Sequence, residues 1–230
     1  MSLKKYYLLQ VNDSLFPIGG YSHSQGLETY IQKGLVHDIK TAEKYIENKI
    51  KMSFKYTDLL AVKLAYERAA KGAVDGLVEL EDVLTASRLP MEQRDAVRKM
   101  GSRFAKTIDG LGLEECHGGV YKAYMEARAE QGVSHGCVYG VFCAVLGIDL
   151  EDVLMHYLYA QTSAMVTNCV KSIPLSQTAG QQILSDCYST LDAVVSDVME
   201  LGEEDLCLSA PGFDIRGIQH ETLYSRIYMS

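Results

Sequence analysis

The sequence predicts an all-α protein, a single-domain bundle of about ten helices around a central apolar helix. Apolar residues recur at steps of three and four positions in several long segments, which is the period of an amphipathic helix. Alternating apolar and polar runs, and the hairpin turns that join β-strands, are missing. The chain has 230 residues, of which 47% are hydrophobic, and a chain of this length can bury one sizeable core. We therefore expect one domain over residues 1–230.

The first long helix is expected from about Thr41 to Ala70, because apolar residues form one stripe there and lysines and glutamates occupy the opposite side. The next helix should begin near Pro90, since proline fits the first turn of a helix, and continue toward Phe104. We expect each of these two helices to bury only one face.

The apolar segment Val133–Ile148 is too short to span a bilayer, which requires roughly 20 residues. Gly136 and Gly140 lie four positions apart within it. Two small residues at this spacing let a neighbouring backbone approach closely. We interpret the segment as a buried helix of a soluble protein.

The segment that starts at Asp149 is expected to form the central helix. Asp149 can cap its N-terminus, with Asp152 at the third helical position. Apolar side chains then occupy one face and much of the opposite face, so other helices have to enclose this one. A further long helix is predicted from about Ala179 to Leu201, after the boundary at Pro174.

Composition and missing motifs exclude several classes of function. With 22 Lys+Arg against 30 Asp+Glu, the net charge is 22 − 30 = −8, and no cationic face for nucleic acid is visible. The phosphate loop GxxxxGK[ST], the zinc motif HExxH and the hydrolase motif GxSxG are absent. The six cysteines form no CxxC pair, and no secretory signal is evident. We therefore expect a cytoplasmic protein that is not an enzyme, a membrane protein or a nucleic-acid binder.

Two segments do not fit the pattern of core helices. Pro17–Glu28 combines a glycine pair with three hydroxyl groups and an imidazole, and Ser22 or Ser24 can cap a helix that begins at Gly26. Near the other end, the segment Phe213–Tyr228 contains aromatic and aliphatic residues beside an arginine, which are types enriched at protein interfaces. This second segment could dock on its own core or on a partner.

The run PIGGYSHSQGLE at Pro17–Glu28 resembles the motif P-x-G-G-[FY]-x-x-S-x-G-L-E of the urease accessory protein family UreF. Glu92–Gly101, Lys171–Gln182 and His220–Ser230 are similar to further stretches of that family. The four stretches occur in the expected order and spread over essentially the whole chain. The sequence departs from the family pattern at two places: members commonly have a small residue or arginine where Asp95 to Arg98 fall, and a glycine where Ser176 stands.

The resemblance implies an all-α adaptor that catalyses nothing by itself. UreF-like proteins bind an accessory protein called UreD or UreH, and recruit and modulate the GTPase UreG. Their assembly on urease apoprotein supports GTP-dependent insertion of nickel. The resemblance also implies a homodimer and no directly bound cofactor, because partner proteins handle nickel and GTP.

The candidate partner-binding residues follow from these two segments and from one lysine. Residues 210–230 are expected to form a tail that docks on the UreD/UreH-type protein, and the loop is expected to face the GTPase. Lys171 is a third candidate, although a lysine at a helix C-terminus is also favourable for the helix dipole. The candidates are Gly19, Gly20, Ser22, Ser24, Gln25, Glu28, Lys171, His220, Glu221, Tyr224, Ser225 and Arg226.

Three other functions stay open from the residues alone. One is a helical carrier of a metal or small ligand that needs no GTPase partner. Another is an enzyme in which His23, His117 or His220 pairs with Glu28 or Glu221 as acid and base. The third is an ordinary helical subunit with a structural role.

Overall fold

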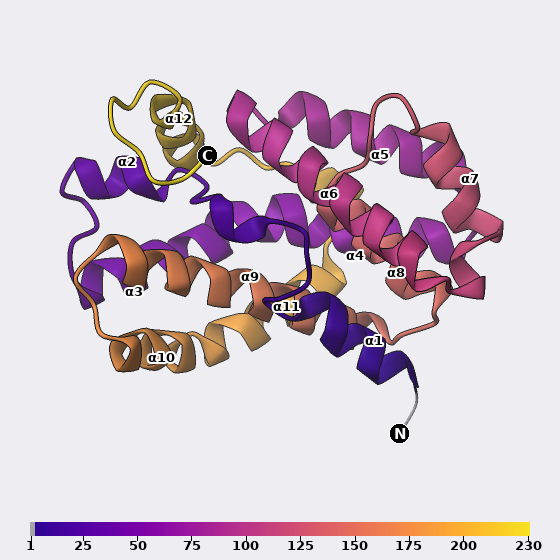
Figure 1. Cartoon of the computed structure of the whole chain (residues 1–230), viewed down its shortest axis with the longest axis horizontal. Coiled ribbons are helices and arrows are strands. Elements are labelled where there is room, and N and C mark those ends of the chain that lie inside the picture. The colour runs from indigo at the N-terminus through magenta and orange to yellow at the C-terminus, as the bar shows by residue number, and fades with distance from the viewer. Residues whose placement is uncertain (1–2) are drawn as a thin grey trace.

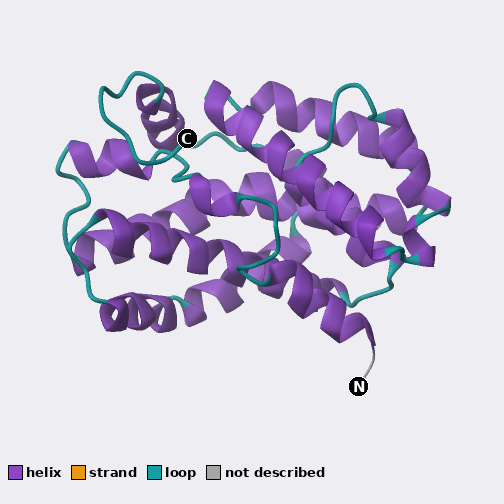
Figure 2. Ribbon diagram, in the orientation of Figure 1, coloured by secondary structure: helices purple, strands orange, loops and turns teal. Residues whose placement is uncertain are grey.

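The computed structural model describes residues 3–230 and consists of helices joined by loops (Figures 1 and 2). Within these residues no strand is present, so the predicted all-α class is confirmed. The long helices are α1 (Leu3–Asn12), α2 (Leu27–Gln32), α3 (Ile39–Lys49), α4 (Leu60–Ala70), α5 (Val74–Ser87), α6 (Met91–Leu111), α7 (Gly119–Ala127), α8 (His135–Val145), α9 (Leu150–Ser172), α10 (Gln177–Asp186), α11 (Tyr188–Glu200) and α12 (Pro211–His220). Short turns η1 (Gly20–Ser22), η3 (Glu114–Cys116) and η4 (Glu203–Asp205) have 3₁₀ geometry.

The helix predicted from Thr41 to Ala70 is continuous in the structure, but its middle third differs from an ordinary α-helix. Between α3 and α4 the segment η2 (Ile50–Leu59) has π-helical hydrogen bonding. A π segment turns the side chains that follow it relative to a regular helix. Periodicity alone predicted the continuity, but not this local change of winding.

The most enclosed helix is α8, not α9 as the sequence predicted. Nine of the eleven residues of α8 are buried. A Cβ atom added to Gly140 would lie 2.5 Å from the carbonyl oxygen of Val62 on α4, so the two backbones approach closely there, as expected. In α9, by contrast, Tyr159 and Ala164 are exposed. Tyrosine and alanine tolerate contact with water, and for this reason their presence overstated the burial of α9.

Two other details concern the helix ends. The carboxylate of Asp149 accepts hydrogen bonds from the backbone amides of Glu151 and Asp152, which confirms it as the N-cap of α9. The single helix predicted from Ala179 to Leu201 is wrong, because α10 ends at Asp186 and α11 begins at Tyr188. The break lets α10 pack on α3 and α9 while α11 packs on α9, η2 and α4.

The C-terminal segment (residues 210–230) lies against the N-terminal part of the chain. It consists of α12 and the residues after it, and α12 packs beside α2 and the start of α6 (Figure 1). Gly26 and Gly217 meet at this contact: a Cβ atom at Gly26 would lie 3.3 Å from the Gly217 backbone, and Gly26 has φ +87°. Glycine at position 26 therefore permits the close approach of α12 to α2. A Cβ atom at Gly217 would instead lie 2.6 Å from side-chain atoms of Pro90 and Gln93, so this glycine permits the approach to the start of α6.

Candidate functional site

The structure joins the two segments that core packing does not explain. We call Pro17–Glu28 the N-terminal loop. The amide of Met229 donates to the carbonyl oxygen of Ser22 at 2.8 Å, and the amides of Ser24 and Gln25 donate to the main-chain oxygen of Ser230 at 2.5 and 2.9 Å. The loop and the C-terminal segment therefore form one surface, although about 200 residues separate them in the sequence.

Glu28 occupies the centre of this junction and is only 5% exposed. Its Oε1 accepts a hydrogen bond from the amide of Ile227 at 2.7 Å, and its Oε2 accepts one from the amide of Tyr228 at 2.9 Å. Hydrogen bonds from backbone amides to a carboxylate are charge-assisted and stronger than neutral ones. Glu28 therefore fixes the backbone of the C-terminal segment.

His220 lies between two carboxylates and is 1% exposed. Its Nε2 is 3.1 Å from Oε2 of Glu28, and its Nδ1 is 2.8 Å from Oε2 of Glu92 on α6. A neutral imidazole has a single N–H, so both contacts are hydrogen bonds only when the ring carries two protons. The other oxygen of Glu92 accepts from Arg226. The two carboxylates therefore lie in contact with the imidazole of His220 and with the guanidinium of Arg226.

Glu92 was not among the predicted site residues, although it opens one of the stretches that resemble the UreF family. Nothing in its local pattern indicates a partner 128 residues away. A neighbouring contact adds to the junction, because Glu221 accepts a hydrogen bond from the amide of Met91 at the start of α6. Two acidic side chains thus connect the C-terminal segment to the first turn of α6.

The end of the C-terminal segment points some side chains inward and others outward. Tyr228 is buried, whereas Ile227 is 78% exposed, and Met229 and Tyr224 are exposed as well. Arg226 keeps one side toward Glu92 and is otherwise exposed, as is Ser225, whose carbonyl oxygen accepts from Gln32. The segment therefore presents Tyr224, Ile227 and Met229 to the outside, and we call these three residues the apolar strip.

The remaining loop candidates have other positions. Gly19 is buried with φ +77°, and the guanidinium of Arg103 occupies the space that a side chain at Gly19 would need. The Ser22 hydroxyl donates to the carbonyl oxygen of Gly19. The expected capping of α2 by Ser22 or Ser24 is wrong, because the N-cap is Gly26 and no side chain caps it.

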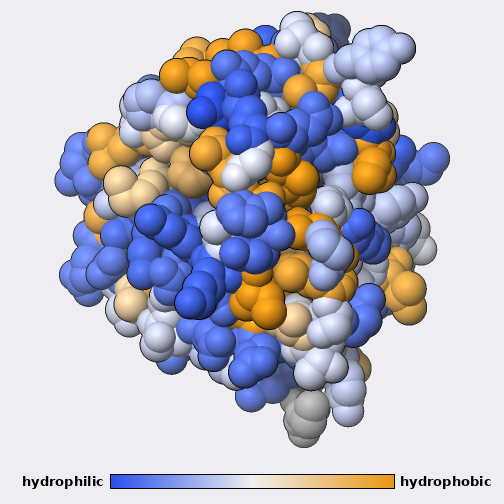
Figure 3. All heavy atoms as spheres, turned by 90° about the vertical axis from the view of Figure 1, so that its left-hand side faces the viewer, coloured by the Kyte–Doolittle hydropathy of each residue, from blue (hydrophilic) through white to orange (hydrophobic). Residues whose placement is uncertain are grey.

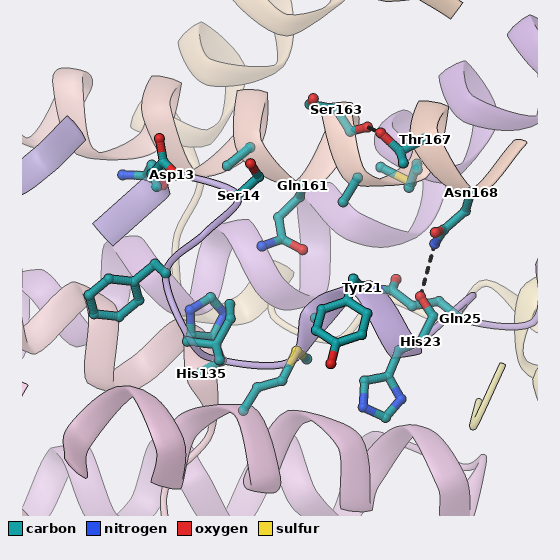
Figure 4. Close-up of a pocket in the computed structure, with 18 of the residues that line it drawn as sticks. Asp13, Ser14, Tyr21, His23, Gln25, His135, Gln161, Ser163, Thr167 and Asn168 are labelled. Atoms are coloured by element: carbon teal, nitrogen blue, oxygen red, sulfur yellow. Dashed lines mark hydrogen bonds between the residues drawn. The ribbon is translucent and has the colours of Figure 1, made fainter. Parts of the chain in front are cut away.

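Gly20, Ser24, Gln25 and Lys171 line a pocket of about 610 Å³ between the N-terminal loop and α9 (Figure 4). Of these four, only Ser24 and Gln25 also take part in the junction, through their backbone amides. The twelve candidates therefore do not form a single cluster. Lys171 is exposed in the last turn of α9, where a cation is favourable for the helix dipole.

The junction offers little to catalysis. His220 and Glu28 do contact each other, as the enzyme alternative requires, but both side chains are too buried for a substrate to reach. Within residues 3–230, no group of three or more His, Cys, Asp or Glu side chains is placed to hold a metal ion. In the same range, no helix combines the length and the apolar character that crossing a bilayer requires.

The fold is that of an all-α protein in which two distant motif segments meet at one junction. Comparison with protein families agrees, since the UreF family model matches residues 36–188, more than half of the chain. The chain belongs to the UreF family of urease accessory proteins, and its role lies in urease maturation. The matched range contains Glu92 and Lys171, but neither the N-terminal loop nor the C-terminal segment.

Proposed function

We propose that this chain is an adaptor of urease maturation in the cytoplasm. It binds a UreD/UreH-type accessory protein and recruits and modulates a UreG-type GTPase. The resulting complex inserts nickel into urease apoprotein at the expense of GTP. In this proposal the chain acts as a homodimer, binds no cofactor itself and catalyses no reaction. Membership of the UreF family supports the role in maturation, and the apolar strip supports the docking step.

The apolar strip is suited to docking because its backbone is already held. Glu28 and Ser22 bind the backbone amides of residues 227–229, and the side chains of Ile227 and Met229 stay exposed. A partner that covers the strip would lose little conformational entropy in ordering it. Tyr224 adds an aromatic side chain of the kind that dominates interface energetics.

The surroundings of the strip are also apolar. Ile215 and Ile218 on α12 are exposed. Figure 3 faces the side of the molecule that carries α2, α3, α10 and the C-terminal segment, and apolar residues gather there between polar ones. Contiguous exposed apolar surface is typical of protein–protein contact sites. We assign this face to the UreD/UreH-type partner.

The N-terminal loop takes a different part in this proposal. Glu28 acts through the segment that it holds, since its side chain is buried. Ser22 and Gln25 are partly accessible and stay candidates for contact with the GTPase. His220, like Glu28, is a positioning residue for the apolar strip and does not itself touch the partner.

A pull-down tests the docking step. Tyr224→Ala combined with Ile227→Ala removes exposed side chains and leaves the hydrogen bonds of Glu28 to the backbone intact. We expect retention of the UreD/UreH-type protein to fall at least about tenfold, the effect of losing one or two interface hot spots. Tyr6→Ala combined with Leu3→Ala removes an exposed aromatic and an exposed aliphatic side chain of α1, outside this face, and serves as the control. Undiminished retention by the first variant would exclude the strip as the docking surface.

A further inference from the structure

A pocket of about 610 Å³ lies between residues 11–25 and α9, away from the apolar strip. Figure 4 shows Gln161, Ser163, Thr167 and Asn168 of α9 on one side, and His135, Tyr21 and His23 on the opposite side. Sites for small molecules have volumes of roughly 300–1,000 Å³. The pocket therefore has room for a small organic molecule.

Two buried polar side chains line this pocket without a hydrogen-bond partner. The Oγ of Ser24 and the Nε2 of His135 have none within residues 3–230, and these residues are 3% and 4% exposed. Buried polar atoms are nearly always paired. An unpaired hydroxyl and an unpaired ring nitrogen in one pocket therefore point to a ligand that accepts or donates hydrogen bonds.

The surroundings of His135 favour a donor at its free nitrogen. Burial lowers the pKa of His135 to about 4, so the ring is neutral near pH 7. The hydroxyl of Tyr157 lies 3.4 Å from its Nδ1. Burial raises the pKa of Tyr157 well above its ordinary value, so this phenol keeps its proton and can donate it to Nδ1. The ring proton then resides on Nε2, the nitrogen that has no hydrogen-bond partner within residues 3–230.

Positive charge gathers around the same pocket. Lys171 lines it, and Lys99 and Arg103 stand one turn apart on α6 beside His23. The pKa of His23 is lowered by burial first and by these two cations next. Within residues 3–230, none of the three cations forms an ion pair with a carboxylate. This local excess is opposite in sign to the net charge of −8.

Among residues 3–230, Asp13 is the one carboxylate that lines the pocket, and it already accepts a hydrogen bond. The side chain of Asp13 accepts a hydrogen bond from the amide of Leu15 at 2.7 Å. Apart from Lys171, the other polar side chains on the walls are hydroxyls, amides and imidazoles, which are neutral. An anionic ligand would thus meet donors and cations rather than competing negative charge.

We propose that this pocket binds a small organic carboxylate, with Ser24 and His135 donating hydrogen bonds to its oxygen atoms and Lys171 balancing its charge. The proposal does not depend on the docking of the apolar strip. It assigns a ligand-binding site to a chain whose adaptor role requires none.

The test uses the full chain, labelled with ¹⁵N, and follows the backbone amide signals of Ser24, Gln25 and Lys171 by NMR during titration. The probes are succinate and citrate, and the uncharged succinamide is the matched control ligand. We expect saturable shifts with the carboxylates and none with succinamide. Lys171→Gln and Ser24→Ala should each weaken the affinity at least about fivefold, since each removes one hydrogen bond or charge contact. Lys122→Gln removes an exposed charge on α7, outside the pocket, and should change nothing.

Three results would overturn the proposal. Shifts that never saturate, or that sodium chloride of the same ionic strength reproduces, would indicate screening instead of a site. An equal loss of affinity in Lys122→Gln would show that the carboxylates do not bind in this pocket. If no carboxylate binds but Lys171→Gln and Ser24→Ala reduce pull-down of the accessory protein, the pocket receives a side chain of a partner, not a small molecule.

Discussion

At the scale of single residues, Glu28 connects the two ends of the chain. Its carboxylate binds two backbone amides of the C-terminal segment and one nitrogen of His220. The sequence motif singled out Glu28 and His220, but their contact spans 192 positions. Local patterns carry no information about such a contact, because helical periodicity reports only which face of a segment is apolar. For this reason sequence reasoning assigned both residues to a partner-binding surface and missed Glu92, which contacts the other nitrogen of His220.

Glu28→Gln should loosen the C-terminal segment without unfolding the chain. A neutral amide accepts these hydrogen bonds less strongly, and bonds to charged groups contribute about 1.5–3 kcal/mol. We expect the amides of Ile227 and Tyr228 to exchange with solvent about ten- to a hundredfold faster. Glu221→Gln makes the same charge change but contacts Met91 instead, so those two amides should keep their protection. Unchanged exchange in Glu28→Gln would show that other contacts hold the segment.

The burial of His135 should make the stability of the fold depend on pH. Burial lowers its pKa from 6.5 to about 4, so between these values the unfolded chain binds a proton that the folded chain does not. The free energy of unfolding should therefore fall as the pH is lowered from 6.5 to 4, by about 3 kcal/mol from this residue. His135→Phe retains the ring contacts with Phe104 and Tyr157. Its denaturant midpoint should fall less over the same pH range, and an identical fall would contradict a buried neutral imidazole.

We expect the buried charge of Lys49 to lower the free energy of unfolding. Burial lowers its pKa to about 8, 2.5 below the ordinary 10.5, which corresponds to about 3 kcal/mol. The ammonium group recovers about 1 kcal/mol by lying 4.7 Å above the ring of Phe213. Lys49→Met should thus raise the free energy of unfolding at pH 7 by about 2 kcal/mol. This gain in the free energy of unfolding should shrink as the pH rises from 8 to 10.5. Chemical denaturation at both pH values tests this, and a gain that grows with pH would contradict the prediction.

At the scale of elements, the close packing of α4 against α8 organises the core. The sequence predicted that some neighbour approaches α8 closely, because two glycines four positions apart in an apolar segment indicate such an approach, but it did not predict that this neighbour is α4. The centre of the bundle and the break at Cys187 could not be predicted. Both depend on which neighbour each apolar face meets, and that is decided by tertiary packing rather than by periodicity.

Gly140→Ala tests that contact directly. The new methyl group would lie 2.5 Å from the carbonyl oxygen of Val62, and such overpacking typically costs about 1–3 kcal/mol. Gly110→Ala in α6 is the matched control, because a methyl group there meets nothing within 4 Å. The control should instead stabilise the chain by up to about 1 kcal/mol, since alanine is the better helix former. Thermal unfolding of both variants distinguishes the two signs.

At the scale of the whole molecule, the chain brings its two distant motif segments to one place. A family model matches residues 36–188, and that range forms most of the helical scaffold. The N-terminal loop and the C-terminal segment lie outside that range and pack on each other. The family match thus rests on the helical scaffold, and the proposed contacts with partners involve the two joined segments.

Co-purification of the chain with the UreD/UreH-type protein and the UreG-type GTPase, with and without residues 216–230, tests the adaptor role most directly. Circular dichroism on both forms establishes that the helices persist. We predict that the full chain retains both partners and that the shortened, folded chain loses the UreD/UreH-type protein. Retention of both partners by the shortened chain would contradict docking through the C-terminal segment.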